Sequence, residues 1–483
     1  MLQAALLIDD MSVEASGNST FDRMDPVSRQ TATRASAASV ADAAHAANVA
    51  ARSFGAWSAT PPTQRRACLN RAADLLLEET EAFAEAMISE TGGTRGWAIF
   101  NCRLAASVLR EAAAMTTQLT GETIPSDKPG AFAMATRQAC GVVFSMAPWN
   151  APVILAARAI AMPLACGNTV VLKGSELSPR THGLLGDVMR RCGLPSGTLN
   201  VVHSSPEMAP NIVETLIAHP AVRRVNFTGS TRVGRIIAET SARHLKPCLL
   251  ELGGKAPMIV LDDADIDAAV DAAVFGAFFH QGQICMSTER IIVDETIAAQ
   301  FVEKFKARAD RIRASDPRDP NCVLGAMITE QAAQRVKGLI DDAINTGAKL
   351  VSGGRQEGVF VDPTILDGVN SAMRIYHEES FGPIASIIRV ADVEEAVSIA
   401  NDTEYGLAAA VFGRDVGRAL QVAQRIESGI CHINAATIQD EPQMPFGGVK
   451  ASGYGRFGGK AGIDAFTELR WITIQTGKQH YPI

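Results

Sequence analysis

One cysteine of the chain lies in a local sequence that favours a reactive thiol. Cys285 stands in Gly282-Gln-Ile-Cys285-Met-Ser, where a long apolar helical pattern breaks at Gly282. A thiol at such a break can be exposed and polarised, whereas most cysteines are buried and inert. The nine cysteines contain no CxxC pair, which argues against a disulfide framework and a structural zinc site. Cys285 is therefore a candidate nucleophile, with a buried inert cysteine as the alternative, and we predict no metal.

A glutamate in apolar surroundings is the candidate general base. Glu251 lies in Leu-Leu-Glu-Leu-Gly-Gly at the end of an apolar run. Burial there would raise the pKa of its carboxyl toward neutrality and make it a usable base. The alternative is an ordinary salt-bridged or exposed glutamate.

Two further segments are suited to a dinucleotide. Phe227-Thr-Gly-Ser-Thr-Arg-Val-Gly234 follows an expected strand and opens an expected helix, where free N–H groups can hold a phosphate. Upstream, Lys173-Gly-Ser-Glu176 ends another strand with a cation and a carboxylate. A carboxylate that accepts hydrogen bonds from ribose hydroxyls repels a 2′-phosphate, so Glu176 would favour NAD over NADP. The alternative for this pair is a surface salt bridge.

These candidates fall within two series of alternating strands and helices. Such alternation predicts parallel sheets covered on both faces, with ligands beyond the carboxyl ends of the strands. After an irregular start come helices over Ser39–Phe54, Thr63–Glu90 and Phe100–Gln118, then the first series: Val142–Met146, Pro152–Ala165, Thr169–Leu172, Thr181–Cys192, Leu199–His203, Glu207–Ala218 and Val222–Phe227. The second series is Met258–Leu261, Ile266–His280, Arg290–Val293, Ile297–Ala314, Glu330–Thr346, Val359–Ile365, Ile384–Val390, Val393–Asn401, Leu407–Phe412, a helix to Ile426, and Gly429–Ile433. Two β-rich segments, Met134–Arg137 and Leu469–Gln475, fit neither series and suggest a small sheet used for association.

Bulk composition is that of a multidomain globular protein. With 483 residues the chain exceeds the roughly 250–300 at which a single core stops growing. A net charge of −7 without a concentrated basic face gives no reason to expect nucleic acid. No apolar run reaches the ~18–20 residues of a bilayer span. The amino terminus has no basic region, and Asp9 and Asp10 interrupt its short apolar run, so we expect no secretory signal and a cytoplasmic protein.

Seven motifs, taken in order, resemble the signature of the aldehyde dehydrogenase superfamily over about residues 20–475. They are Pro148-Trp-Asn150, Lys173-Gly-Ser-Glu176, Phe227-Thr-Gly-Ser230, Glu251-Leu-Gly-Gly254, Gly282-Gln-Ile-Cys285, Glu379-Ser-Phe-Gly-Pro383 and Pro445-Phe-Gly-Gly448. The resemblance implies an α/β fold with a Rossmann-like parallel-sheet NAD-binding domain, residues 1–120 and 139–250. It also implies a second α/β catalytic domain, 251–449, and a small β oligomerisation arm, 121–138 and 466–483, in a homodimer or a dimer of dimers.

The resemblance also assigns roles to residues. Cys285 is the expected nucleophile, Asn150 and the Cys285 N–H the expected oxyanion hole, and Glu251 the base that activates the water for thioester hydrolysis. The residues implied for binding NAD are Trp149, Lys173, Ser175, Glu176, Gly229, Ser230, Glu379 and Phe381.

Within the family the resemblance is to enzymes of aromatic aldehydes, and salicylaldehyde of bacterial naphthalene degradation is the expected substrate. Ala151 replaces a bulkier residue of many relatives and leaves room for a ring. Arg158 would face an ortho-hydroxyl or a product carboxylate, or else lie on a helix surface. Trp97, Ile284, Met286 and Phe446 are expected to line the substrate pocket, with plain core packing as the alternative.

Two positions depart from the family pattern. Gly174 stands where proline is usual, and we expect it to loosen the ribose-binding turn. Phe457 follows Arg456 where many relatives have a second glutamate, so no second proton-relay carboxylate is assigned. Alternatives to the aromatic substrate are an aliphatic aldehyde or semialdehyde with the same mechanism, and a catalytically inactive homologue that keeps the fold.

Overall fold

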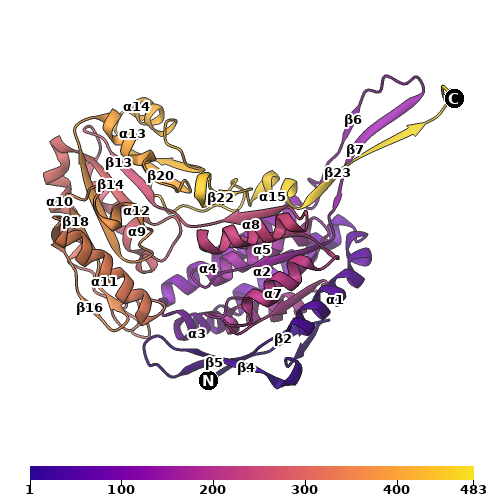
Figure 1. Ribbon diagram of the computed structural model, residues 1–483, viewed down its shortest axis with the longest axis horizontal. Coiled ribbons are helices and arrows are strands. Elements are labelled where there is room, and N and C mark those ends of the chain that lie inside the picture. The colour runs from indigo at the N-terminus through magenta and orange to yellow at the C-terminus, as the bar shows by residue number, and fades with distance from the viewer.

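The computed structural model describes residues 1–483 and contains two large sheets, each covered by helices, with a β arm that projects from them (Figure 1). The first sheet has eight strands in the order β22-β12-β11-β8-β9-β10-β2-β3. Its central strands run parallel: β8 (Val142–Met146), β9 (Thr169–Lys173), β10 (Leu199–Val202), β11 (Val222–Thr228) and β12 (Cys248–Glu251). Antiparallel pairings add β2 (Leu6–Ile8) with β3 (Met11–Val13) at one edge and β22 (Gly453–Tyr454) at the other.

Alternating side chains of the central strands build a core on each face of this sheet. Phe144 belongs to the core that includes α1 (Val40–Ser58), α7 (Ala209–Ala218) and α8 (Thr231–Arg243). Its neighbour Val143 belongs to the opposite core, as expected where successive strand residues point to opposite faces. That second core is formed with α2 (Pro62–Glu78), α3 (Thr80–Thr91), α4 (Arg95–Met115), α5 (Pro152–Ala165) and α6 (Pro179–Arg191).

The second sheet has seven strands in the order β15-β18-β19-β14-β13-β20-β21. All but β15 run parallel to their neighbours. The strands are β13 (Ala256–Val260), β14 (Thr288–Asp294), β15 (Lys349–Ser352), β18 (Thr364–Asp367), β19 (Ile384–Val390), β20 (Ala408–Phe412) and β21 (Ile430–Ile433). One face packs against α9 (Ile266–Phe278) and α10 (Glu295–Ala309), and the other against α11 (Glu330–Asn345), α12 (Arg374–His377), α13 (Val393–Asn401) and α14 (Val416–Ala423).

A three-stranded antiparallel sheet forms the arm at the right of Figure 1. It consists of β6 (Glu122–Ile124), β7 (Ala131–Ala139) and β23 (Thr467–Gln475). Both β-rich segments predicted to stand apart, Met134–Arg137 and Leu469–Gln475, therefore lie in one sheet. Large apolar side chains on it are exposed, with Trp471 79 % and Leu469 64 % accessible.

The predicted irregular start is wrong, because residues 2–36 contain five short strands. Two of them extend the first sheet, and β1 (Leu2–Ala4), β4 (Thr20–Met24) and β5 (Thr31–Ser36) form a separate sheet. The predicted helix Thr63–Glu90 is two helices, because Glu79 departs from helical geometry with φ −93° and ψ 11°. The predicted strand Val359–Ile365 is also divided, between β17 (Phe360–Val361), which pairs with β16 (Gln356–Glu357), and β18.

The chain passes from the first sheet to the second between Glu251, the last residue of β12, and Ala256, the first of β13. Residues 450–465, which the predicted domains leave out, return to the first body through β22 and α15 (Gly459–Ala465). Cofactor binding by the first body and catalysis by the second stay predictions. No helix combines the length and apolar character needed to cross a membrane.

Candidate active site

The carboxyl ends of three parallel strands bring distant candidate residues to one edge of the first sheet. Asn150 follows β8, Gly229 follows β11, and Glu251 ends β12. The strand register sets Phe227 beside Met146 and Thr228 beside Glu251, so the three loops begin at the same level. The N–H of Gly229 also donates to the carbonyl of Glu251 at 3.0 Å.

A strained turn carries Cys285 to this edge. Helix α9 ends at Phe278, and the next residues have left-handed backbones, with φ 49° at His280, 56° at Gln281 and 66° at Gly282. Only glycine fits at Gly282, because a Cβ there would lie 2.1 Å from the carbonyl oxygen of Gly382. The Gln281 amide holds the turn by donating to the carbonyl of Ala326 at 2.7 Å.

The Asn150 amide is fixed close to this turn. Its side-chain Nδ2 donates to the carbonyl of Gln283 at 3.0 Å, and the backbone carbonyl of Asn150 accepts from Trp97 Nε1 at 3.1 Å. The Trp97 ring in turn stacks on His280, with centroids 4.5 Å apart. Nδ2 carries a second hydrogen, and the N–H of Cys285 has no hydrogen-bond partner within the protein. The site therefore has two free donors beside the thiol.

Burial raises the pKa of both the thiol and the carboxyl of the site. Burial, and then the charge of Glu251, raises the pKa of the Cys285 thiol well above its ordinary value. Burial also raises the pKa of Glu251 to about 7, against the smaller opposite effects of the Cys285 thiol and Arg158. Neither carboxyl oxygen of Glu251 has a hydrogen-bond partner, so either can take up a proton.

Two cavities meet at Cys285. One, of about 330 Å³, contains Glu251 and the ends of β8, β11 and β12 in its lining. The other, of about 260 Å³, is lined mainly by apolar side chains. Cys285, Asn150 and Leu155 belong to both linings, so the thiol is reached from two sides.

The larger cavity gathers five of the residues predicted to bind NAD. They are Trp149, Gly229, Ser230, Glu379 and Phe381. Gly229 lets its backbone lie close to a ring, since a Cβ there would fall 2.3 Å from Phe227. Ser230 caps helix α8 by accepting from the N–H of Val233 at 3.4 Å. The Glu379 carboxylate accepts from the N–H of Gly254 at 2.9 Å, and burial raises its pKa to about 8.

The other three predicted cofactor residues, Lys173, Ser175 and Glu176, lie outside this cavity at the end of β9. Lys173 Nζ is 3.5 Å from Glu176 Oε2, but the lysine side chain is only 8 % exposed, so a simple surface salt bridge is the wrong description. The N–H of Gly174 donates to the carbonyl of Val202 at 3.0 Å, which ties this turn to β10. A proline has no such donor.

A side chain at position 174 would also collide with two buried histidines. A Cβ on Gly174 would lie 2.9 Å from His203 Nδ1 and 3.0 Å from His182 Nδ1. These two rings therefore explain why a glycine stands at position 174, where proline is usual in the family.

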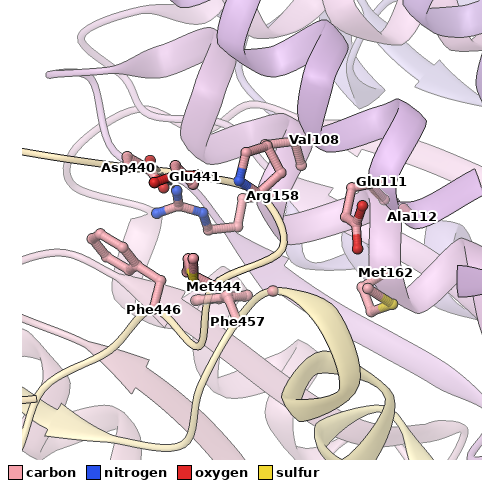
Figure 2. Close-up of a pocket in the computed structure, with 13 residues that line it drawn as sticks. Val108, Glu111, Ala112, Arg158, Met162, Asp440, Glu441, Met444, Phe446 and Phe457 are labelled. Atoms are coloured by element: carbon pink, nitrogen blue, oxygen red, sulfur yellow. Dashed lines mark hydrogen bonds and ion pairs between the residues drawn. The ribbon is translucent and has the colours of Figure 1, made fainter. Parts of the chain in front are cut away.

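The smaller cavity contains every residue predicted for the substrate pocket. Arg158, Trp97, Ile284, Met286 and Phe446 all lie in its lining. Arg158 is only 6 % exposed, so the alternative of a helix-surface arginine is wrong. Figure 2 shows its guanidinium between the ring of Phe446, 4.2 Å away, and the carboxylate of Asp440, with which it forms an ion pair.

Sequence reasoning missed the residues that support the Glu379–Phe381 segment. Glu289 accepts from the N–H of Ser380 at 2.8 Å and forms a buried ion pair with Lys255. Arg335 donates to the carbonyl of Ser380 at 2.8 Å. Gly253-Gly-Lys255 and Ser-Thr-Glu289-Arg carry no local pattern that pairs them, since 34 residues separate the two partners.

In a fold of two α/β sheets, the site combines a thiol and an amide that line both cavities with a carboxyl that lines the larger one. The sequence model of the aldehyde dehydrogenase family matches residues 13–472, and the chain belongs to this family of aldehyde-oxidising oxidoreductases.

Individual relatives cover the whole chain. A vanillin dehydrogenase of Pseudomonas fluorescens is 59 % identical over 483 residues, and a salicylaldehyde dehydrogenase of Pseudomonas putida is 52 % identical over 482, each covering 100 % of both chains. The crystal structure of a salicylaldehyde dehydrogenase from Pseudomonas putida G7, complexed with salicylaldehyde, is similar with a TM-score of 0.98. That chain is 51 % identical, and the match covers 100 % of both chains.

Proposed function

We propose that the protein oxidises an aromatic aldehyde to its carboxylic acid with NAD as the oxidant and Cys285 as the nucleophile. The observation that carries this proposal is the position of Cys285 between two cavities, with Asn150 and Glu251 in the lining beside it. One cavity suits the cofactor, and the other suits a ring.

The first chemical step needs a base, because burial keeps the Cys285 thiol protonated. Glu251 takes that proton, and the thiolate forms a carbon–sulfur bond to the aldehyde carbon while the carbonyl π electrons move to oxygen. The free N–H groups of Asn150 and Cys285 stabilise this oxyanion. One such donor typically contributes about 3–4 kcal/mol.

The residues of the larger cavity fit a dinucleotide. Gly229 and Ser230 stand at the N-terminal end of α8, where a pyrophosphate is favoured. Glu379 would accept from the nicotinamide ribose, with Phe381 and Trp149 beside it, and Lys173, Ser175 and Glu176 would hold the adenosine ribose. Bound NAD⁺ supplies the acceptor for the hydride that leaves the substrate carbon, so the bond to Cys285 becomes a thioester. We propose NAD rather than NADP, because Glu176 would repel a 2′-phosphate.

The last step is hydrolysis of this thioester. After Glu251 has released its first proton to solvent, its carboxylate takes a proton from a water molecule. The hydroxide adds to the acyl carbon, the carbon–sulfur bond breaks, and the sulfur leaves as the thiolate that regains a proton. The products are a carboxylate and free Cys285.

The apolar cavity favours an aromatic substrate over an aliphatic aldehyde or semialdehyde. Rings of Trp97, Phe100, Phe275 and Phe446 belong to its lining. Salicylaldehyde is one candidate. Vanillin is the second, because the relative named for it is more similar than the one named for salicylaldehyde.

A comparison of specificity constants tests the substrate class. We expect kcat/KM for salicylaldehyde, vanillin and benzaldehyde to exceed that for straight-chain aldehydes by at least about tenfold, or ~1.4 kcal/mol of transition-state discrimination. The reverse order would overturn the aromatic assignment.

Cys285→Ala should abolish NADH formation with every aldehyde, and Cys68→Ala, at another partly buried thiol, is the matched control.

Two wider features belong to the same proposal. We propose that the arm of β6, β7 and β23 joins copies of the chain in a homodimer or a dimer of dimers, because its apolar side chains are exposed in the single chain. We also propose a cytoplasmic location.

A further inference from the structure

We propose that Asp440 determines specificity by accepting a hydrogen bond from a hydroxyl group on the aromatic ring of the substrate. This inference rests on the proposed oxidation of an aromatic aldehyde. It assigns the recognition of one chemical group, a ring hydroxyl, to a pocket that is lined mainly by apolar side chains.

Polar groups are few in the cavity that would hold the ring. Besides Asn150 beside the thiol, the only polar residues in its lining are Arg158, Gln439 and Asp440. Gln439 is exposed, and its amide donates to Glu441 at 3.2 Å. The Arg158–Asp440 pair is therefore the buried polar feature of the ring pocket.

The Asp440 carboxylate uses only one of its two oxygens. Its Oδ2 pairs with Arg158, and its side chain is 10 % exposed. Oδ1 is buried and has no hydrogen-bond partner. A buried acceptor without a donor costs about 1–3 kcal/mol, and more when it is charged, so a donor brought by the substrate would recover that energy.

Arg158 is less suited to contact the substrate than its partner is. Its guanidinium already donates to Asp440 and lies 4.2 Å above the Phe446 ring, which holds it in place from the other side (Figure 2). Asp440 also balances its charge, so a product carboxylate gains little there. Arg158 is thus a positioning residue that orients Asp440, rather than the direct contact to an ortho-hydroxyl expected from sequence.

The preferred substrate class follows from the chemistry of a carboxylate. It accepts a hydrogen bond from a neutral phenolic hydroxyl and repels a ring carboxylate. Benzaldehyde has no such hydroxyl, and methoxybenzaldehydes have an oxygen but no proton to donate. The pocket should therefore distinguish hydroxylated rings from both.

The variant Asp440→Asn tests the inference while keeping the shape of the side chain. Arg158 would hold the amide oxygen, leaving the NH₂ group to face a substrate hydroxyl. We expect kcat/KM for the best of 2-, 3- and 4-hydroxybenzaldehyde to fall about tenfold or more, the effect of one hydrogen bond to a charged group. Benzaldehyde should change less than about threefold, since it makes no such bond. Glu441→Gln is the matched control, because Glu441 lines only the neighbouring cavity of Figure 2.

Equal losses with hydroxylated and plain benzaldehyde would make Asp440 merely structural and overturn the inference, as would no loss at all. If Asp440→Asn does not fold, the wild-type enzyme still decides. It should prefer the hydroxy compound over its methoxy counterpart by about tenfold, and equal constants would contradict the inference.

Binding without turnover separates this inference from the proposed function. Calorimetry on Cys285→Ala should show tighter binding of the same hydroxybenzaldehyde than of benzaldehyde, and adding Asp440→Asn should remove the difference. If these affinities behave as stated but the wild-type protein oxidises no aromatic aldehyde, only the proposed function fails. If oxidation occurs and the affinities do not differ, only the role of Asp440 fails.

Discussion

Single residues set the pH at which this site can work. Glu251 has a pKa of about 7, so near neutral pH it is divided between the acid and the carboxylate. The Cys285 thiol stays protonated well above its ordinary range. A base with a pKa near the working pH combines an available lone pair with adequate strength. In the proposed mechanism, the Cys285 thiol therefore becomes a nucleophile only when the Glu251 carboxylate accepts its proton.

The pH–rate profile should report this carboxyl group. We expect kcat/KM to rise tenfold per pH unit below about 7 and to level off above it, because only ionised Glu251 accepts a proton. Steady-state rates with a substrate that has no ionising group, such as benzaldehyde, give the measurement. Glu251→Gln should lower kcat by ~10²–10⁴ and flatten the profile. An inflection that persists in Glu251→Gln would assign the titration to another group.

The same burial makes stability depend on pH. Because the folded pKa of Glu251, about 7, lies above its ordinary value of 4.5, the folded state keeps a proton that the unfolded chain has lost. The contribution of Glu251 is therefore complete below pH 4.5 and declines as the pH rises to about 7.

Glu251→Gln should consequently be more stable than the wild type at pH 8, by on the order of 3 kcal/mol, and close to it at pH 4.5. Denaturant unfolding at both pH values measures the difference. Glu441→Gln, outside the catalytic cavities, should show no such pH-dependent gain. An equal effect of Glu251→Gln at both pH values would contradict the account.

At the scale of elements, two connecting segments carry the chemistry, and rigid neighbours hold both. The turn before Cys285 follows from the end of α9 and three successive left-handed residues. Glu289 and Arg335 hold the Glu379–Phe381 segment by hydrogen bonds to the backbone of Ser380, and Lys255 forms an ion pair with Glu289. Ligand-binding loops usually stand on a rigid scaffold of helices and strands. These two segments are also held by hydrogen bonds from neighbouring side chains.

Gly282→Ala should damage the turn severely. The added Cβ would meet the Gly382 carbonyl at 2.1 Å in a backbone that already has φ 66°, so we expect a loss of more than about 3 kcal/mol in unfolding free energy and of most activity. Gly358→Ala is the matched control. Its φ of 56° is similar but a Cβ there meets nothing within 4 Å, so only the ~1 kcal/mol of left-handed strain applies. Equal losses in the two variants would show that the collision is unimportant.

Local periodicity predicted the elements whose packing is itself regular. The bounds predicted for β8 and α5 agree with the structure at both ends, since each is a mostly apolar run with Gly or Pro close to both of its ends. The five strands up to Ser36 were missed because each is only three to six residues long, and one of them, β2, pairs with the distant β10. The break at Glu79 has neither glycine nor proline to mark it.

Prediction of the site divides in the same way, into residues that local motifs identify and pairs that only the folded chain brings together. The motifs named Cys285, Asn150 and Glu251, and the structure brings all three to one place. No local pattern could connect Arg158 with Asp440, because 282 residues separate them and only the packed fold makes them partners. The same holds for the histidines beneath Gly174, whose position depends on α6 and β10.

At the scale of the whole molecule, the projecting arm is the part for which we propose contact with another copy of the chain. Trp471, Leu469 and Ile474 on β23 are 79 %, 64 % and 49 % exposed. Isolated exposed apolar residues are ordinary, but several on one narrow sheet indicate an interface. The strand pairing that forms the arm joins β7 and β23 along nine residue pairs, so the arm itself is firmly built.

Trp471→Glu should therefore shift the protein toward smaller assemblies without unfolding the chain. A charge placed in an apolar interface opposes association more than it affects the monomer. Sedimentation velocity at several concentrations measures the shift. Leu245→Glu, at a residue 91 % exposed beyond the end of α8, should leave the distribution unchanged. A wild-type protein that is monomeric at all concentrations would refute the assignment of the arm.

Both cavities reach the sulfur of Cys285, and this has a consequence for inhibition. Because Cys285, Asn150 and Leu155 line both cavities, a single elongated molecule that passes the sulfur could occupy both cavities together. Such a compound would compete with both the cofactor and the aldehyde. Because its two ends belong to one molecule, two modest affinities would combine into one strong affinity, as in linked binding groups.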